Sequence, residues 1–168
     1  GAALLVGCVS NKPNDDASKA MLPDWVIMPQ QQVGEGALAA TECVADNAGM
    51  SILKSKATAL ARAGIAQQIQ INVQAMDKTY QSLTERGEES EAGSTFESVS
   101  KQVTDQSLQG AIPERVGYVS GRNGDDLFCV MVVLSPEKNR KVFESILRAS
   151  DRQVGPDSEA LLYQEFRA

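Results

Sequence analysis

The chain has 168 residues, of which 42% are hydrophobic, and a formal net charge of −6. This length fits one domain of ordinary size with tails, and the acidic balance excludes a typical nucleic-acid-binding protein, which needs clustered Lys and Arg. The chain has no histidine, so it lacks the commonest general base and the commonest metal ligand.

The N-terminal stretch is apolar and ends at a cysteine, with the motif Leu5-Val6-Gly7-Cys8. This motif resembles the lipobox of bacterial lipoproteins, in which the cysteine becomes the first mature residue and carries lipid. We therefore expect residues 1–7 to be the end of a truncated signal peptide and Cys8 to bear a covalent lipid. The alternative is a short buried strand with an ordinary core cysteine.

A polar segment follows, and we interpret residues 8–22 as the lipidated cysteine and a flexible tether, since they are rich in Asn, Asp, Ser and Lys. By the same resemblance, Val9 and Ser10 after the cysteine, in place of an Asp, favour the outer membrane over the inner one. Several acyl chains give stable anchoring without a membrane-spanning helix.

The folded region is expected to begin near Pro23, with Trp25 at the edge of its core. Residues 33–44 predict a first strand, in which Gly34 and Gly36 suggest a bulge or close packing. Residues 51–84 then carry apolar side chains at steps of three and four, and they predict an amphipathic helix roughly 50 Å long.

Shorter elements complete the chain. The segment Ser94–Glu97 has the S-x-x-E form of a capping box, which predicts a short helix that ends near Gly110. Residues 112–120 and 127–134 predict two strands joined by an Asn-Gly hairpin turn, and the second strand is apolar without a break, as in the centre of a sheet.

Two further helices are expected near the C-terminus. One starts at Ser135-Pro136, and residues 158–166 predict a last segment that docks on the sheet or on a neighbouring subunit. Together these elements predict a single two-layer α+β domain over residues 23–168 with a C-terminal tail. About three strands, partly antiparallel, would be covered by one long and two shorter helices.

The run from Pro23 to Ile69 resembles the LPP20 lipoprotein family. The resemblance rests on the lipobox, the PDWV motif, the Gly-rich strand, and the rhythm of Ala61, Ala63, Ile65, Ala66 and Ile69 in the long helix. It implies an outer-membrane lipoprotein that faces the periplasm and has no enzymatic role. Some relatives look like flagellar accessory lipoproteins that form rings around the motor, and the family offers no catalytic residues.

Two cysteines remain inside the predicted domain, Cys43 and Cys129. In an oxidising periplasm they can pair if neighbouring strands bring them together; the alternative is two buried free thiols, and the sequence leaves both open. A metal site at these cysteines lacks further ligands, and a redox-catalytic pair lacks the C-x-x-C spacing.

The sequence therefore favours a non-enzymatic structural or assembly module of the bacterial cell envelope. Its expected partners are the membrane, through the lipid on Cys8, and either further copies of itself or other envelope proteins, with no nucleic acid. No cofactor other than the covalent lipid and no metal are expected. The alternative function is a small-ligand carrier that uses the sheet face beneath the long helix.

Overall fold

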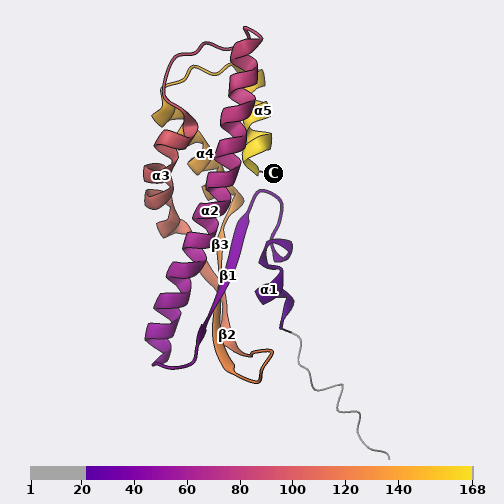
Figure 1. Ribbon diagram of the computed structural model, residues 1–168, viewed down its shortest axis with the longest axis vertical. Helices are drawn as coiled ribbons and strands as arrows, with labels where there is room; N and C mark the ends of the chain where they lie inside the picture. The colour runs from indigo at the N-terminus through magenta and orange to yellow at the C-terminus, as the bar shows by residue number, and fades with distance from the viewer. Residues whose placement is uncertain (1–21, 168) are drawn as a thin grey trace, which may run out of the picture.

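The computed structural model describes residues 22–167, so Cys8 and the expected signal peptide lie outside the described residues. Figure 1 shows an elongated molecule, with the sheet beside one half of a long helix and shorter helices beside the other half. The elements are α1 (Asp24–Ile27), η2 (Pro29–Gln32), β1 (Leu38–Ala45), α2 (Met50–Glu85), α3 (Phe96–Ser107), η3 (Leu108–Gly110), β2 (Ile112–Ser120), β3 (Asp126–Leu134), α4 (Pro136–Ser150) and α5 (Pro156–Arg167).

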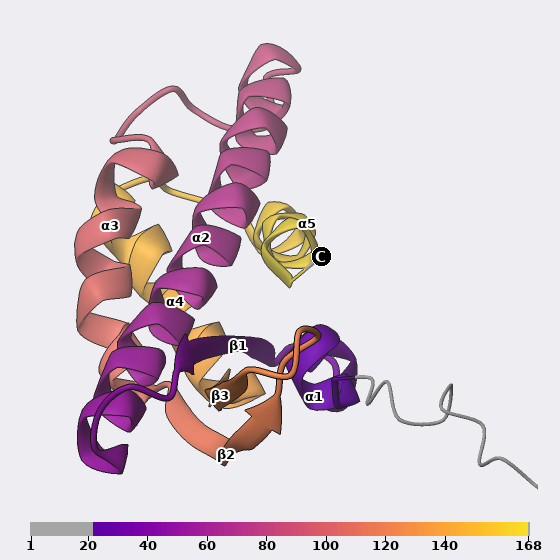
Figure 2. The same ribbon diagram turned by 60° about the horizontal axis from the view of Figure 1, so that its bottom comes forward.

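The three strands form one antiparallel sheet in the order β1-β3-β2 (Figure 2). The predicted α+β class, the hairpin between β2 and β3 and the central place of the apolar strand are confirmed. Gly124 takes a positive φ of 80° in the hairpin turn, which explains the glycine there. The prediction for the first strand is wrong at its start, because residues 33–37 form a turn in which Gly36 has φ 84°.

The long helix α2 carries the predicted apolar stripe almost unchanged. Leu53, Ile65 and Val73 are among its buried side chains, whereas the apolar Leu60 is 43% exposed and the polar Thr58 is buried. Small residues allow close packing on the sheet, and a Cβ at Gly64 would lie 3.2 Å from the Cβ of Ala40.

The ends of the shorter helices follow local capping rules. Ser135 caps α4 as predicted, and its side chain accepts a hydrogen bond from the backbone N of Lys138. The predicted capping box at Ser94 is wrong by one residue, because Thr95 is the N-cap of α3 and accepts from the backbone N of Ser98.

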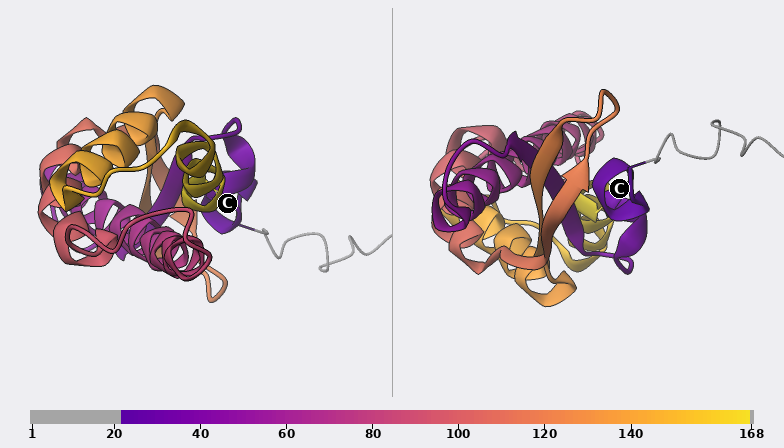
Figure 3. Two further views of the ribbon diagram at one scale, coloured as in Figure 1. Left: turned by 90° about the horizontal axis from the view of Figure 1, so that it is seen from above. Right: turned by 90° about the horizontal axis from the view of Figure 1, so that it is seen from below.

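Two features of the layers differ from the prediction. The last helix, α5, packs along α2, where Leu162 and Phe166 join the main core, and it does not dock on the sheet. The second face of the sheet is also covered over β1 and β3, because α1 and η2 pack there (Figure 3). Trp25 of α1 contacts a small cluster around Met131. A thin third layer thus shields β1 and β3 on the face opposite α2.

Candidate functional site

The two cysteines of the domain lie directly opposite each other on β1 and β3 and form a disulfide. Cys129 is fully buried and Cys43 is half-buried, and both face the side of the sheet away from α2. Antiparallel pairing places their Cα atoms 4.0 Å apart. Of the two alternatives that the sequence leaves open, the structure therefore has the bridge.

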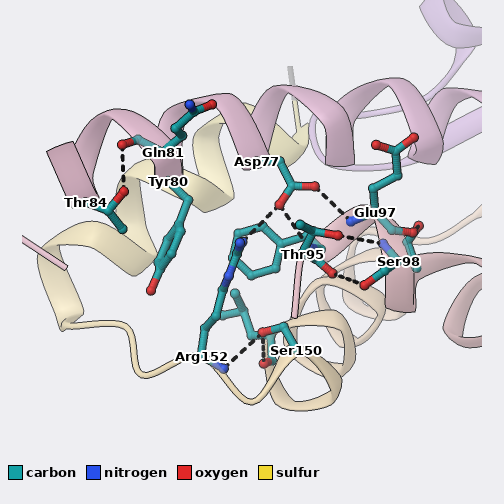
Figure 4. A network of polar contacts seen from close by, with 12 residues as sticks. Asp77, Tyr80, Gln81, Thr84, Thr95, Glu97, Ser98, Ser150 and Arg152 are labelled. Atoms are coloured by element: carbon teal, nitrogen blue, oxygen red, sulfur yellow. Dashed lines mark hydrogen bonds and ion pairs between the residues drawn. The ribbon is translucent and has the colours of Figure 1, made fainter. Parts of the chain in front are cut away.

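The main polar cluster of the domain lies where α2, α3 and the α4–α5 connection meet (Figure 4). We call it the Asp77–Arg152 cluster, and it consists of Asp77, Tyr80, Phe96 and Arg152. Asp77 and Arg152 are 81% and 88% buried, since their side chains are 19% and 12% exposed. None of the predicted site residues belongs to this cluster.

Asp77 joins two helices and the connection after α4 through its carboxylate. The oxygen Oδ1 accepts hydrogen bonds from the backbone N of Phe96 and from Nη1 of Arg152, both at 2.9 Å, and Oδ2 accepts from the backbone N of Glu97 at 2.9 Å. The first amides of a helix have no partner within that helix and bear partial positive charge. A carboxylate on α2 therefore caps α3 from outside.

Arg152 fills the space between two aromatic rings. Its guanidinium carbon lies 4.1 Å from the ring centroid of Tyr80 and 4.5 Å from that of Phe96, a cation–π arrangement. Its Nε atom is buried without a hydrogen-bond partner among residues 22–167. The cation is thus held by Asp77 and by the two rings.

The neighbouring backbone is fitted closely around this cation. The N–H of Ser94 donates to the backbone O of Ser150 at 2.8 Å, and a Cβ at Gly93, where φ is 92°, would lie only 2.6 Å from that oxygen. Asp151 takes a left-handed conformation at the end of α4, which turns the chain so that Arg152 points into the cluster.

Tyr80 is a hydrogen-bond donor within the cluster. Its hydroxyl donates to the backbone O of Ser90 at 2.7 Å. Burial raises the pKa of Tyr80 above its ordinary value; the Arg152 cation acts in the opposite direction, and Glu89 adds to the rise. The hydroxyl therefore stays protonated at neutral pH and acts as a structural donor.

A cleft of about 440 Å³ borders the cluster on the solvent side. Charges of both signs line it, with Asp77, Glu91 and Glu97 against Lys78 and Arg152. These groups largely neutralise one another, and the buried ones already have structural partners. The geometry is suited to holding three segments of the chain together, and it shows no nucleophile paired with a base.

Of the two charged residues in this cluster, only Asp77 has a recognisable signal in the sequence. Asp77 directly follows the buried Met76 on α2, and an acidic residue beside an apolar stripe is a candidate cap for a neighbouring helix. Arg152 is 75 residues away, and tertiary packing alone brings it to Asp77.

In the part of the chain that the structure describes, no helix is long and apolar enough to cross a membrane. The same residues contain no group of three or more Cys, Asp or Glu side chains that could hold a metal ion. No protein-family model, curated protein or solved structure matches the chain.

Proposed function

We propose that this protein is a lipid-anchored, non-enzymatic structural or assembly module of the bacterial cell envelope. Cys8 carries the lipid, residues 8–22 form the tether, and the domain faces the periplasm from the outer membrane. The observation that carries the proposal is the LVGC motif at residues 5–8 with a polar segment after it.

The disulfide supports an exported location. Disulfides persist in oxidising compartments such as the bacterial periplasm and are rare in the cytosol. Cys43 and Cys129 are bonded to each other, so Cys8 remains as the cysteine for the lipid. A segment as long as 8–22 can span at most about 50 Å, which is enough to hold the domain clear of the membrane surface.

The use of the buried polar groups supports a structural role. Asp77 caps a helix, Arg152 is stacked between two rings, and Tyr80 donates to a backbone oxygen. Each of these side chains holds one part of the fold to another. Within this proposal, the resemblance to LPP20 lipoproteins extends the role to an accessory component of the flagellar motor.

One observation favours a second candidate, a small-ligand carrier, although not at the sheet face beneath α2 that the sequence suggested, because core side chains fill that face. The cleft beside the Asp77–Arg152 cluster has a volume, about 440 Å³, that suits a small molecule. Its lining of opposed charges would select a zwitterionic or polar ligand. Native mass spectrometry of the purified protein tests this candidate, since a carrier should retain a bound small molecule and a structural module should not.

The lipid anchor is tested with Cys8→Ser in the full-length precursor, expressed in a Gram-negative host with labelled palmitate. We expect the wild-type protein to incorporate label and to sediment with outer membranes, and the variant to lose both properties. The double variant Cys43→Ala/Cys129→Ala is the matched control, because it removes two cysteines and keeps Cys8. A Cys8→Ser protein that is still labelled and still in outer membranes would contradict the proposal.

A further inference from the structure

The two edges of the sheet differ in whether other parts of the chain cover their backbone groups. The edge at β1 is partly covered, because the side chain of Gln30 donates to the backbone O of Ala37 and accepts from the backbone N of Ala39. The other edge is β2, and Figure 2 shows no helix or strand beyond it. Among the described residues, β2 pairs with β3 alone.

The pairing fixes which backbone groups of β2 point outward. The N–H of Ala39 points away from β3, toward Gln30, and backbone groups alternate in direction along a strand. It follows that Cys129 directs its backbone toward β2, where its partner is Gly117. Val116 and Tyr118, the neighbours of Gly117, therefore direct their N–H and C=O groups to the free edge.

The side chains at this edge are apolar and exposed. Val116 is 43% exposed and Tyr118 is 52% exposed, although both lie on the sheet face that α2 covers over β1 and β3. The ring of Tyr118 packs on Phe128 with centroids 5.1 Å apart, so it is held in place. An open edge with apolar side chains is a template for another strand.

The open stretch is short and bounded at both ends. At one end Pro113 and a register shift before Arg115 interrupt the strand, and such irregularities protect a sheet edge from pairing. At the other end the hairpin turn begins at Gly121. The central part of β2 lacks this protection.

We propose that this edge pairs antiparallel with the same edge of a second copy of the chain, about a two-fold axis at Gly117. In this register Val116 lies opposite Tyr118 of the second copy, and Arg115 lies opposite Val119. The two valines and two tyrosines form one apolar cluster across the axis. The absence of a Cβ at Gly117 allows the strands to approach closely at their centre.

Two of the competing two-fold registers are less favourable. An axis at Arg115 would set two like charges opposite each other, which destabilises strand pairing. An axis at Val116 would set the Tyr118 ring opposite the Glu114 carboxylate. The side chains of β2 thus favour the axis at Gly117 over the axes at Arg115 and Val116, and in this register the strand is complementary to a second copy of itself.

This inference adds a specific contact to the proposed assembly role, and its function in the envelope rests on that proposal. Anchoring in a shared membrane would raise the local concentration of the domains. The pairing itself needs no lipid. It is therefore measured on the full chain carrying Cys8→Ser, so that failure of the anchor and failure of the pairing are separate results.

Sedimentation velocity over a concentration series tests the pairing. We expect the mean mass to rise from 18.0 kDa toward twice that value. Val116→Lys should weaken association at least about tenfold, whereas Ile71→Lys, at a 65% exposed apolar residue of α2, should leave it unchanged. Far-UV circular dichroism checks that each variant folds, and Tyr118→Lys is a second variant at the same edge.

Hydrogen exchange then tests the register. In the associated state the amides of Val116 and Tyr118 should gain protection with increasing concentration. Those of Arg115, Gly117 and Val119, which already face β3, should be protected at every concentration. A chain that stays at 18.0 kDa, an assembly that Val116→Lys leaves intact, or new protection confined to other strands would each overturn the proposal.

Discussion

Replacement of Asp77 by alanine removes the carboxylate that links α2 to α3 and to the segment after α4. Three hydrogen bonds of 2.9 Å are lost together, from the backbone N of Phe96, the backbone N of Glu97 and Nη1 of Arg152. The guanidinium, only 12% exposed, then keeps its charge without a counter-ion.

The expected loss of stability has two contributions, the lost cap of α3 and the unpaired charge of Arg152. Removal of a helix cap costs about 1 kcal/mol. Breaking a buried ion pair costs about 3 to 5 kcal/mol when one charge stays behind, and partial solvent access to both side chains reduces that figure here. We expect Asp77→Ala to lower the free energy of unfolding by about 3 kcal/mol, and Asp77→Asn by less, since the amide keeps one acceptor oxygen.

Urea unfolding monitored by circular dichroism, with the disulfide intact, measures the difference. The matched control is Asp105→Ala, which removes the carboxylate of an exposed ion pair on α3. In that pair Oδ2 of Asp105 lies 3.9 Å from Nζ of Lys101. Such pairs contribute less than about 1 kcal/mol. If Asp77→Ala and Asp105→Ala agree within about 0.5 kcal/mol, the cluster does not hold the helices together and the reasoning is refuted.

Three further predictions concern the disulfide, the fitted glycine and the buried tyrosine. Cys43→Ala/Cys129→Ala should lower the free energy of unfolding by about 4 kcal/mol, because the bridge closes a loop of 86 residues; an unchanged urea midpoint would contradict this. Gly93→Ala should cost about 2 kcal/mol more than Gly87→Ala, because both have positive φ but only a Cβ at Gly93 would clash, 2.6 Å from the backbone O of Ser150, and overpacking costs about 1 to 3 kcal/mol. Tyr80 keeps its proton longer in the folded state, so stability should fall as the pH rises past about 10, and Tyr80→Phe should reduce that slope in pH-dependent urea titrations.

The elements with strong local signals are predictable from the sequence. The stripe of α2, the Asn-Gly turn and the unbroken apolar run of β3 each determine their structure through nearest neighbours, and they appear as expected. The start of β1 is harder to predict, because residues 33–37, with the sequence Val-Gly-Glu-Gly-Ala, continue directly into the small residues of the strand. Their turn depends on Gly36, which takes a positive φ beside Pro136 of a distant helix.

The Asp77–Arg152 cluster depends even more on contacts between residues that are distant in the sequence. The sequence indicates Phe96 and Tyr80 as core residues, and both are buried. The position of Arg152 between their rings depends on the turn after α4 and on the packing of α3 against α2 and α4. The docking of α5 on α2 likewise depends on tertiary packing, in which Leu162 and Phe166 join the main core.

The most direct measurement is the mass of the N-terminal peptide of the mature protein, purified from a Gram-negative host that expresses the full-length precursor. We expect this peptide to begin at Cys8 and to carry acyl chains. A mature protein that retains residues before Cys8, with an unmodified thiol at that position, would contradict the central claim of a lipid-anchored envelope module.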